Sequence, residues 1–239
     1  MFWNKGFFIT GTDTCVGKTT IAAAIAWSMK RKGLDVGVMK PFATSDKKYS
    51  LKYKSADAGI LATVADVSDT YDNINPFFYS LPTAPYTASL VKRSARVDIS
   101  RAISCYNKLA SRHDKMIVEG IGGILVPLTR NKSLADFARA INLPVLVVAR
   151  FQIGMINHIL LTLRACVDYS LKVKGIILND LTDWKGQVKK EVLIETIEKV
   201  SKVRVVATIP FMENNTPKKV AEALESSRSL CRKKSLVHY

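Results

Sequence analysis

Short apolar runs alternate along the chain with longer stretches whose apolar residues recur at helical spacing. The runs that predict strands are residues 7–10, 36–39, 115–119, 144–149, 173–178 and 203–209. The stretches that predict helices are residues 21–29, 55–65, 98–112, 155–167, 188–200 and 217–230. Strands that are apolar throughout and alternate with amphipathic helices indicate a parallel sheet buried on both faces. We therefore expect an α/β fold in which helices cover both faces of a mostly parallel central sheet.

One segment departs from this alternation. Residues 75–88 contain several prolines and aromatic residues without a clear period, so we expect an irregular excursion over the surface. The sequence shows no internal repeat, linker or low-complexity segment. A chain of 239 residues is long enough to bury one sizeable core. We expect a single domain over residues 1–239.

A loop rich in glycine and hydroxyl groups joins the first predicted strand to the first predicted helix. Its sequence, GTDTCVGKTT, begins at Gly11 and contains Gly17, Lys18 and Thr19. Glycines let backbone N–H groups close around phosphate oxygens, the lysine adds positive charge, and the next hydroxyl can bind magnesium. The alternative is a tight turn with a solvated lysine. Together with the strand–helix pattern, the loop favours a P-loop NTPase-like three-layer sandwich.

Polar residues also occupy the carboxyl ends of the other predicted strands, where ligands bind in parallel sheets. Glu119 ends a strand of the kind that carries a magnesium-binding carboxylate in P-loop enzymes, and Asp57 begins a predicted helix. Each residue has a local alternative, such as a salt bridge for Glu119 or a helix cap for Asp57. Their shared position favours a nucleotide site. The remaining strand-end residues are Lys40, Arg150, Asn179 and Pro210.

The composition narrows the class of protein. There are 36 basic and 20 acidic residues, which gives a formal net charge of +16. A large positive charge is typical of nucleic-acid-binding proteins, but here the lysines are spread over the chain without interleaved aromatic residues. We favour solvated basic faces and expect no nucleic-acid partner.

Cysteine spacing and hydropathy indicate the cellular compartment. The four cysteines are scattered, which favours reduced thiols over a zinc site; they are Cys15, Cys105, Cys166 and Cys231. No apolar run reaches the length of a membrane span, and the first residues do not resemble a signal sequence. We expect a cytoplasmic protein without a membrane partner.

These motifs together resemble those of the dethiobiotin synthetases, the ATP-dependent carboxylases of biotin synthesis. The resemblance extends over most of the chain, and five residues rather than four separate Gly11 from Gly17, as in that family's form of the P-loop. The further shared motifs are KPFAT from Lys40, SADA from Ser55, NPF from Asn75, PTAP from Pro82, VEGIGG from Val118, PVLVV from Pro144, GMINH from Gly154, Asn179-Asp180 and Ile209-Pro210.

The resemblance implies a carbon–nitrogen ligase that inserts CO2, supplied as bicarbonate, between the two amines of 7,8-diaminononanoate (diaminopelargonic acid). ATP activates the intermediate carbamate as a carbamic-phosphoric anhydride, and ring closure releases ADP and phosphate. The implied catalytic residues are Lys18 and Lys40, and the implied Mg²⁺ ligands are Thr19, Asp57 and Glu119. The implied ATP-binding residues are Thr14, Cys15, Val16, Gly17, Lys18, Thr19, Thr20, Asp57, Glu119, Gly120, Gly122, Asn179, Asp180 and Pro210.

The resemblance also implies a homodimer, because the substrate of this family lies across a two-fold interface. Its distal carboxylate meets the start of the helix that carries Asn157 of the partner subunit, where the positive end of a helix favours an anion. The implied substrate-binding residues are Thr44, where serine is usual, together with Gly122, Gly123 and Asn157.

Two other protein classes share the loop and the fold. Partitioning-type ATPases, which have a deviant P-loop, typically carry a second lysine early in the loop, where this chain has Thr12. They also use a membrane-binding helix at the C-terminus, which is not evident here. Cobyrinate-synthase-like amidotransferases carry an additional glutaminase domain with a nucleophilic cysteine, which we do not expect in this chain. Both classes remain alternatives.

Overall fold

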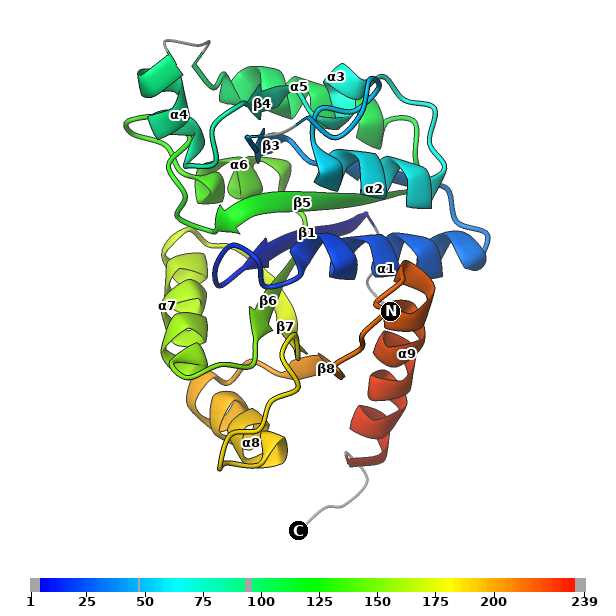
Figure 1. The fold of residues 1–239 in the computed structure, drawn as a ribbon, viewed down its shortest axis with the longest axis vertical. Coiled ribbons are helices and arrows are strands. Elements are labelled where there is room, and N and C mark those ends of the chain that lie inside the picture. The colour runs from blue at the N-terminus through cyan, green and yellow to red at the C-terminus, as the bar shows by residue number, and fades with distance from the viewer. Residues whose placement is uncertain (1–4, 47, 93–95, 235–239) are drawn as a thin grey trace.

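Six parallel strands form the central sheet of the protein. The computed structural model describes residues 5–46, 48–92 and 96–234. The strand order is β2-β5-β1-β6-β7-β8, so β1 lies between β5 and β6 (Figure 1). The strands are β1 Gly6–Gly11, β2 Val36–Met39, β5 Lys115–Gly123, β6 Val145–Arg150, β7 Val173–Asn179 and β8 Val205–Ile209.

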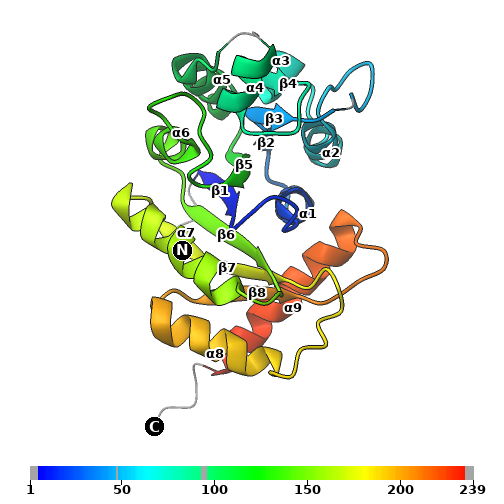
Figure 2. The same ribbon diagram turned by 60° about the vertical axis from the view of Figure 1, so that its left-hand side comes forward.

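Helices cover both faces of this sheet, as predicted. On one face, α1 (Lys18–Arg31), α2 (Ala56–Ala65) and α9 (Pro217–Lys234) contribute to one hydrophobic cluster. On the other, α5 (Ile99–Ala110), α6 (Leu134–Ile141), α7 (Met155–Asp168) and α8 (Lys190–Ser201) contribute to a second. Figure 2 shows α1 and α2 on one side of the sheet and α6 and α7 on the other. The three-layer α/β sandwich is confirmed.

The segment at residues 75–88 corrects our prediction of an irregular excursion. It contains β4 (Phe77–Tyr79), which pairs in parallel with β3 (Phe42–Thr44), and the start of α4 (Pro85–Lys92). The short helix α3 (Tyr71–Ile74) precedes it. A three-residue strand is too short to show a period, and Pro85 is tolerated because the first N–H groups of a helix have no intrahelical partner. Elements this short carry little sequence signal.

The small β3–β4 sheet is joined to the main core by aromatic rings. The Phe42 ring stacks on Phe77, with centroids 5.8 Å apart, and meets Phe137 of α6 edge-on at 5.3 Å. Phe42 is fully buried. The chain therefore leaves the main sheet after β2, passes Lys40 and Pro41, and enters a second sheet that packs on the same core.

Candidate active site

The loop between β1 and α1 lies across the carboxyl ends of three neighbouring strands. The backbone N–H of Thr12 donates to the carbonyl of Val148 on β6 at 2.9 Å. The side-chain amide of Asn179, the last residue of β7, donates to the carbonyl of Val16 at 3.2 Å. Gly17 precedes α1 with φ 93°, and a Cβ atom there would lie 2.1 Å from Nδ2 of Asn179. Glycine is therefore required at this position for the loop to approach β7.

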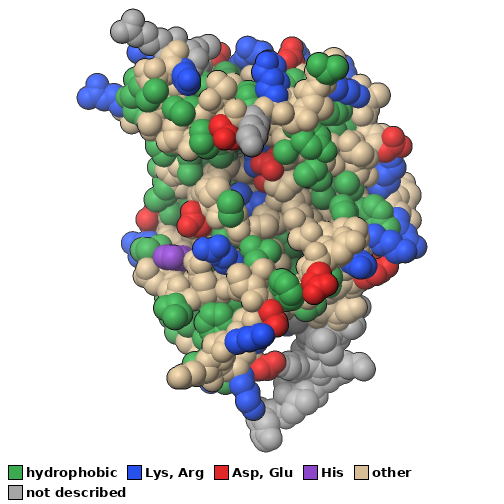
Figure 3. Space-filling model, in the orientation of Figure 1, with side chains coloured by type: hydrophobic (Ala, Val, Ile, Leu, Met, Phe, Trp, Pro, Cys, Tyr) green, Lys and Arg blue, Asp and Glu red, His purple; other side chains and the backbone are tan. Residues whose placement is uncertain are grey.

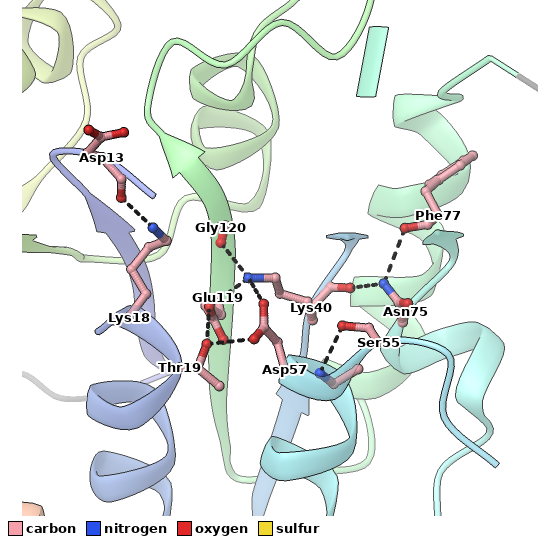
Figure 4. Close-up of polar contacts among 11 residues, drawn as sticks. Asp13, Lys18, Thr19, Lys40, Ser55, Asp57, Asn75, Phe77, Glu119 and Gly120 are labelled. Atoms are coloured by element: carbon pink, nitrogen blue, oxygen red, sulfur yellow. Dashed lines mark hydrogen bonds and ion pairs between the residues drawn. The ribbon is translucent and has the colours of Figure 1, made fainter. Parts of the chain in front are cut away.

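Lys18 begins α1 and turns its side chain back over the loop. Its Nζ donates to the carbonyl of Asp13 at 2.6 Å (Figure 4). Burial, together with the positive charge of Lys40, lowers the pKa of Lys18 to about 8. The ammonium group of this lysine is thus held against the backbone of the loop, where a phosphate would need it.

Lys40 lies at the centre of a buried ionic cluster, although it follows β2 and its partners come from α2 and β5. Its Nζ is 2.6 Å from Oε1 of Glu119 and 2.8 Å from Oδ2 of Asp57 (Figure 4). It also donates to the carbonyl of Gly120 at 3.0 Å. The hydroxyl of Thr19 lies 2.9 Å from Oδ1 of Asp57 and 2.8 Å from Oε1 of Glu119. The structure therefore brings together four residues that are far apart in the sequence.

The charges in this cluster are strongly coupled. Burial by itself lowers the pKa of Lys40, but the carboxylates of Glu119 and Asp57 more than reverse this and raise it above its usual value. Burial raises the pKa of Glu119, whereas Lys40 holds the pKa of Asp57 below its usual range despite burial. The ammonium group of Lys40 thus faces two carboxyl groups, and Lys18 adds a second positive charge that is coupled to all three.

The oxygen atoms of the cluster fit a small divalent cation. Among the described residues, Oε2 of Glu119 is buried without a hydrogen-bond partner. Two carboxylates and one hydroxyl are the hard oxygen donors that Mg²⁺ prefers, with phosphate and water oxygens completing its coordination. The described part of the chain gathers no group of three or more His, Cys, Asp or Glu residues that would bind a metal unaided. This site therefore suits a cation that arrives with a phosphate ligand.

The cluster lies in a cleft of about 480 Å³. The predicted site residues that line it are Thr14, Cys15, Gly17, Lys18, Thr19, Thr20, Lys40, Thr44, Asp57, Glu119 and Gly122. Sequence reasoning gave no role to other lining residues, although Pro82, Thr83 and Ala84 belong to the PTAP motif and were marked by it. Ala43 and Ile121 also line the cleft and belong to the KPFAT and VEGIGG motifs, whereas Val126 carries no sequence signal that we recognised.

A second, smaller pocket of about 50 Å³ adjoins the cleft, because Thr20 lines both. Asn179, Asp180 and Pro210, to which the family resemblance assigns ATP binding, line it together, with Leu181, Phe211 and Met212 as apolar walls. The carboxylate of Asp180 accepts hydrogen bonds from the backbone N–H of Trp184 at 3.0 Å and from Nζ of Lys190 at 2.5 Å. The side chain of Asp180 thus organises the loop after β7.

The remaining predicted residues lie outside these two pockets. Val16 and Gly120 contribute carbonyl groups that bind Asn179 and Lys40, as described above. Gly123 pairs with Gly11 in the main sheet, because β5 continues past its predicted end at Glu119. Asn157 is exposed near the start of α7, and it lines neither pocket. Within one chain, the structure does not bring Asn157 to the cleft.

The face drawn in Figure 3 agrees with solvated basic side chains, the interpretation that we favoured for the net charge. Figure 3 shows basic side chains spread over the face that it displays, with acidic ones among them, rather than gathered in one patch. Among the described helices, none combines the length and hydrophobicity needed to cross a membrane.

A P-loop at the carboxyl edge of a parallel sheet, facing a second lysine and two acids, defines a P-loop nucleotide-binding protein. Solved structures with the same fold include a ParA family ATPase from Chlorobium tepidum TLS, at TM-score 0.52 and 17% identity, covering 98% of this chain and 94% of that chain. The MinD cell division protein of Aquifex aeolicus has TM-score 0.54 and 15% identity, covering 98% of this chain and 100% of that chain. At these identities the likeness concerns the fold alone.

Sequence comparison identifies the family. The sequence model of an AAA domain family matches residues 5–219. The ATP-dependent dethiobiotin synthetase BioD of Nitrosopumilus maritimus is 37% identical, covering 88% of this chain and 90% of that protein. The enzyme of the same name from Bacillus subtilis strain 168 is 32% identical, covering 95% of this chain and 96% of that protein. The chain belongs to the ATP-dependent dethiobiotin synthetase family.

Proposed function

We propose that this protein is an ATP-dependent dethiobiotin synthetase. It joins CO2 to the two amines of 7,8-diaminononanoate, closes the cyclic urea, and releases ADP and phosphate. The observation that carries this proposal is that the ammonium group of Lys40 and the hydroxyl of Thr19, the residue after the P-loop lysine, both contact the carboxylates of Asp57 and Glu119. Family membership supplies the substrates, and the cleft supplies groups suited to a phosphoryl transfer to a carbamate.

The two lysines divide the work of binding negative charge. Lys18, held over the loop, would leave the carbonyl of Asp13 for the terminal phosphate of ATP. Lys40 would lie between that phosphate and the carbamate and would neutralise the charge that spreads over both during transfer. Thr44 and the amides of Gly122 and Gly123 would hold the carbamate and the substrate amine in line with the phosphate.

The oxygens of Thr19, Asp57 and Glu119 would hold Mg²⁺. When bound, this ion would neutralise phosphate oxygens and so assist phosphoryl transfer. The loop residues from Thr14 to Thr20 and the backbone around Gly120 and Gly122 would bind the phosphates. The pocket at Asn179, Asp180 and Pro210 would receive the nucleotide base, for which Asn179 provides a polar edge between apolar walls.

We also propose a cytoplasmic homodimer in which Asn157 of the partner subunit binds the distal carboxylate of the substrate. The exposure of Asn157 near the start of α7, away from the cleft of its own chain, supports a role toward a second copy. Apolar residues exposed on this helix, such as Leu161 and Val167, would be covered in a dimer.

A direct test measures dethiobiotin and phosphate formation from ATP, Mg²⁺, bicarbonate and 7,8-diaminononanoate. The expected result is ATP turnover that requires the diamine and yields one phosphate per ring closed. Parallel reactions contain DNA or lipid vesicles in place of the diamine. These reactions distinguish a dethiobiotin synthetase from a partitioning-type ATPase, whose turnover would respond to DNA or vesicles. Turnover that responds to DNA or vesicles but not to the diamine would refute the proposal.

A further inference from the structure

Asn75, from the NPF motif, is buried beside Lys40 but lines neither pocket. It is 2% exposed, and its Nδ2 donates to the backbone carbonyl of Lys40 at 2.6 Å and to that of Phe77 at 3.3 Å (Figure 4). The backbone N–H of Lys40 in turn donates to the carbonyl of Ile74 at 2.8 Å. Both backbone polar groups of Lys40 are therefore bound by two consecutive residues.

The same side chain is bound from the other side by Tyr71. The Tyr71 hydroxyl donates to Oδ1 of Asn75 at 2.6 Å, and it accepts from the backbone N–H of Ser55 at 3.3 Å. Ser55 is the N-cap of α2, where its hydroxyl accepts from the N–H of Ala58 at 3.3 Å. The first turn of that helix carries Asp57. A continuous chain of hydrogen bonds therefore runs from the backbone of Lys40 to the start of the helix that presents Asp57.

We propose that Tyr71 and Asn75 are positioning residues that fix Lys40 and Asp57 relative to each other. This proposal rests on the proposed function. Neither residue lines the cleft, yet together they connect the two segments that supply the ion pair between Lys40 and Asp57. Because phosphoryl transfer is sensitive to small displacements of the groups that align it, loosening this connection lowers turnover without removing a charged group.

Tyr71→Phe is the most selective variant, because it removes one oxygen and keeps the ring that packs edge-on against Tyr53 at a centroid distance of 5.7 Å. We expect turnover to fall about fivefold to tenfold, the range given by one or two lost hydrogen bonds. Nucleotide affinity stays close to that of the wild type, since the P-loop is unchanged. The matched control is Tyr106→Phe, the same change in a buried tyrosine of α5, which should leave turnover unchanged.

Asn75→Asp is a second variant that breaks the same connection from the other end. It replaces the amide donor by an oxygen that faces the carbonyl of Lys40, and we expect a larger loss of turnover than for Tyr71→Phe. Turnover of every variant is expressed per mole of nucleotide bound. Because unfolded protein binds no nucleotide, a smaller folded fraction does not lower this value. Tyr71→Phe therefore keeps the proposal testable even when Asn75→Asp yields little folded protein.

The decisive experiment combines Tyr71→Phe with Lys40→Ala in a double-mutant cycle. If Tyr71 acts through Lys40, the tyrosine substitution lowers single-turnover ring closure in the wild-type background and has little further effect once Lys40 is gone. The same fold loss in both backgrounds would overturn the proposal, because it would show a general structural effect. Wild-type turnover that ignores the diamine would instead refute the proposed function itself, so the two failures are distinguishable.

Discussion

The two walls of the cleft hold their charged groups in different ways. In the loop wall, residues 11–20, backbone contacts to β6 and β7 fix the position of Lys18. In the network wall, residues 40–79, buried side chains fix the position of Lys40 and Asp57. The loop wall is a continuous local structure, whereas the network wall is assembled from separate segments. Single side chains should therefore matter more in the network wall, and backbone conformation more in the loop wall.

The largest effect should come from Lys40→Ala in the network wall. We expect turnover per bound nucleotide to fall by about a thousandfold, because in the proposed function the transferred phosphoryl group would lose the ammonium group of Lys40. Nucleotide affinity should change little, since the loop wall is intact. Stopped-flow phosphate release and equilibrium nucleotide binding measure the two quantities.

The surface variant Lys30→Ala, which removes the exposed ion pair with Asp66, is the control for that experiment. It should match the wild type in turnover and nucleotide affinity. Loss of nucleotide affinity in Lys40→Ala as severe as its loss of turnover would contradict the division of labour between the walls.

The loop wall is tested by Gly17→Ala. Alanine is strained at φ 93°, and its Cβ would meet the amide of Asn179. A strain of about 1–2 kcal/mol that displaces the loop corresponds to about tenfold weaker nucleotide binding. Gly33→Ala, at the other end of α1, is the control, because its φ is 78° and a Cβ there meets nothing within 4 Å.

The control should lose about 1 kcal/mol of unfolding free energy and keep its nucleotide affinity. Titration with a fluorescent ATP analogue, together with urea unfolding, distinguishes the two glycines. Equal nucleotide affinities in both variants would show that the contact between the loop and Asn179 is dispensable.

Ser55→Ala should have a smaller effect on the network wall. Loss of an N-cap costs about 1 kcal/mol of stability, and here it also loosens the helix that presents Asp57. We expect turnover to fall about threefold. Asp98→Ala removes the N-cap of α5, where Oδ1 accepts from the N–H of Arg101 at 3.1 Å, and should lower stability alone. Thermal unfolding and steady-state turnover of both variants provide the comparison. Equal turnover in the two variants would show that the N-cap at Ser55 does not contribute to the position of Asp57.

The smallest effect concerns pH and the contact of Asp69, in the network wall, with His113, which lies outside that wall. His113 lies between Asp35, 2.9 Å from Nδ1, and Asp69, 2.7 Å from Nε2. Partial burial lowers the pKa of His113, but hydrogen bonds to both carboxylates raise it above its usual value. The stabilising charge is therefore fully present below the unfolded pKa of about 6.5 and is lost as the pH rises through the folded pKa.

His113→Gln should accordingly lower the unfolding temperature at about pH 5.5 and much less at about pH 9. Thermal unfolding of both proteins across this range measures the difference. A difference that grows with pH would have the wrong sign and would show that the neutral imidazole is the stabilising form.

The sequence was most informative where the chemistry is local. The P-loop, the helix that follows it and β2 were predicted because glycines, apolar spacing and a lysine stand next to one another. The approach of Lys40 to Glu119 also followed from the sequence, since both lie near the carboxyl ends of strands, and β2 and β5 prove to be neighbours. The rule that ligand-binding residues gather at the carboxyl ends of parallel strands thus predicts that two residues 79 positions apart in the sequence lie close together.

The network wall shows where such reasoning stops. Asn75 was marked by its motif, but its contact with Lys40 depends on the pairing of β3 with β4, which are too short to carry a period. Asp180 was assigned to the nucleotide pocket, which it lines, yet the direction of its carboxylate toward Lys190 depends on a loop fold that the sequence does not reveal. Side-chain directions in irregular segments are set by tertiary packing.

The rings around Phe42 have a consequence for how molecules enter the cleft. Because Phe42 packs against both Phe77 and Phe137, the small β3–β4 sheet and the main sheet form one rigid frame. A hinge between them would expose a fully buried phenylalanine. We therefore expect entry and release to depend on the cleft-lining residues that follow β4, namely Pro82, Thr83 and Ala84, and substitutions there are where changes in the exit rate of products should be sought.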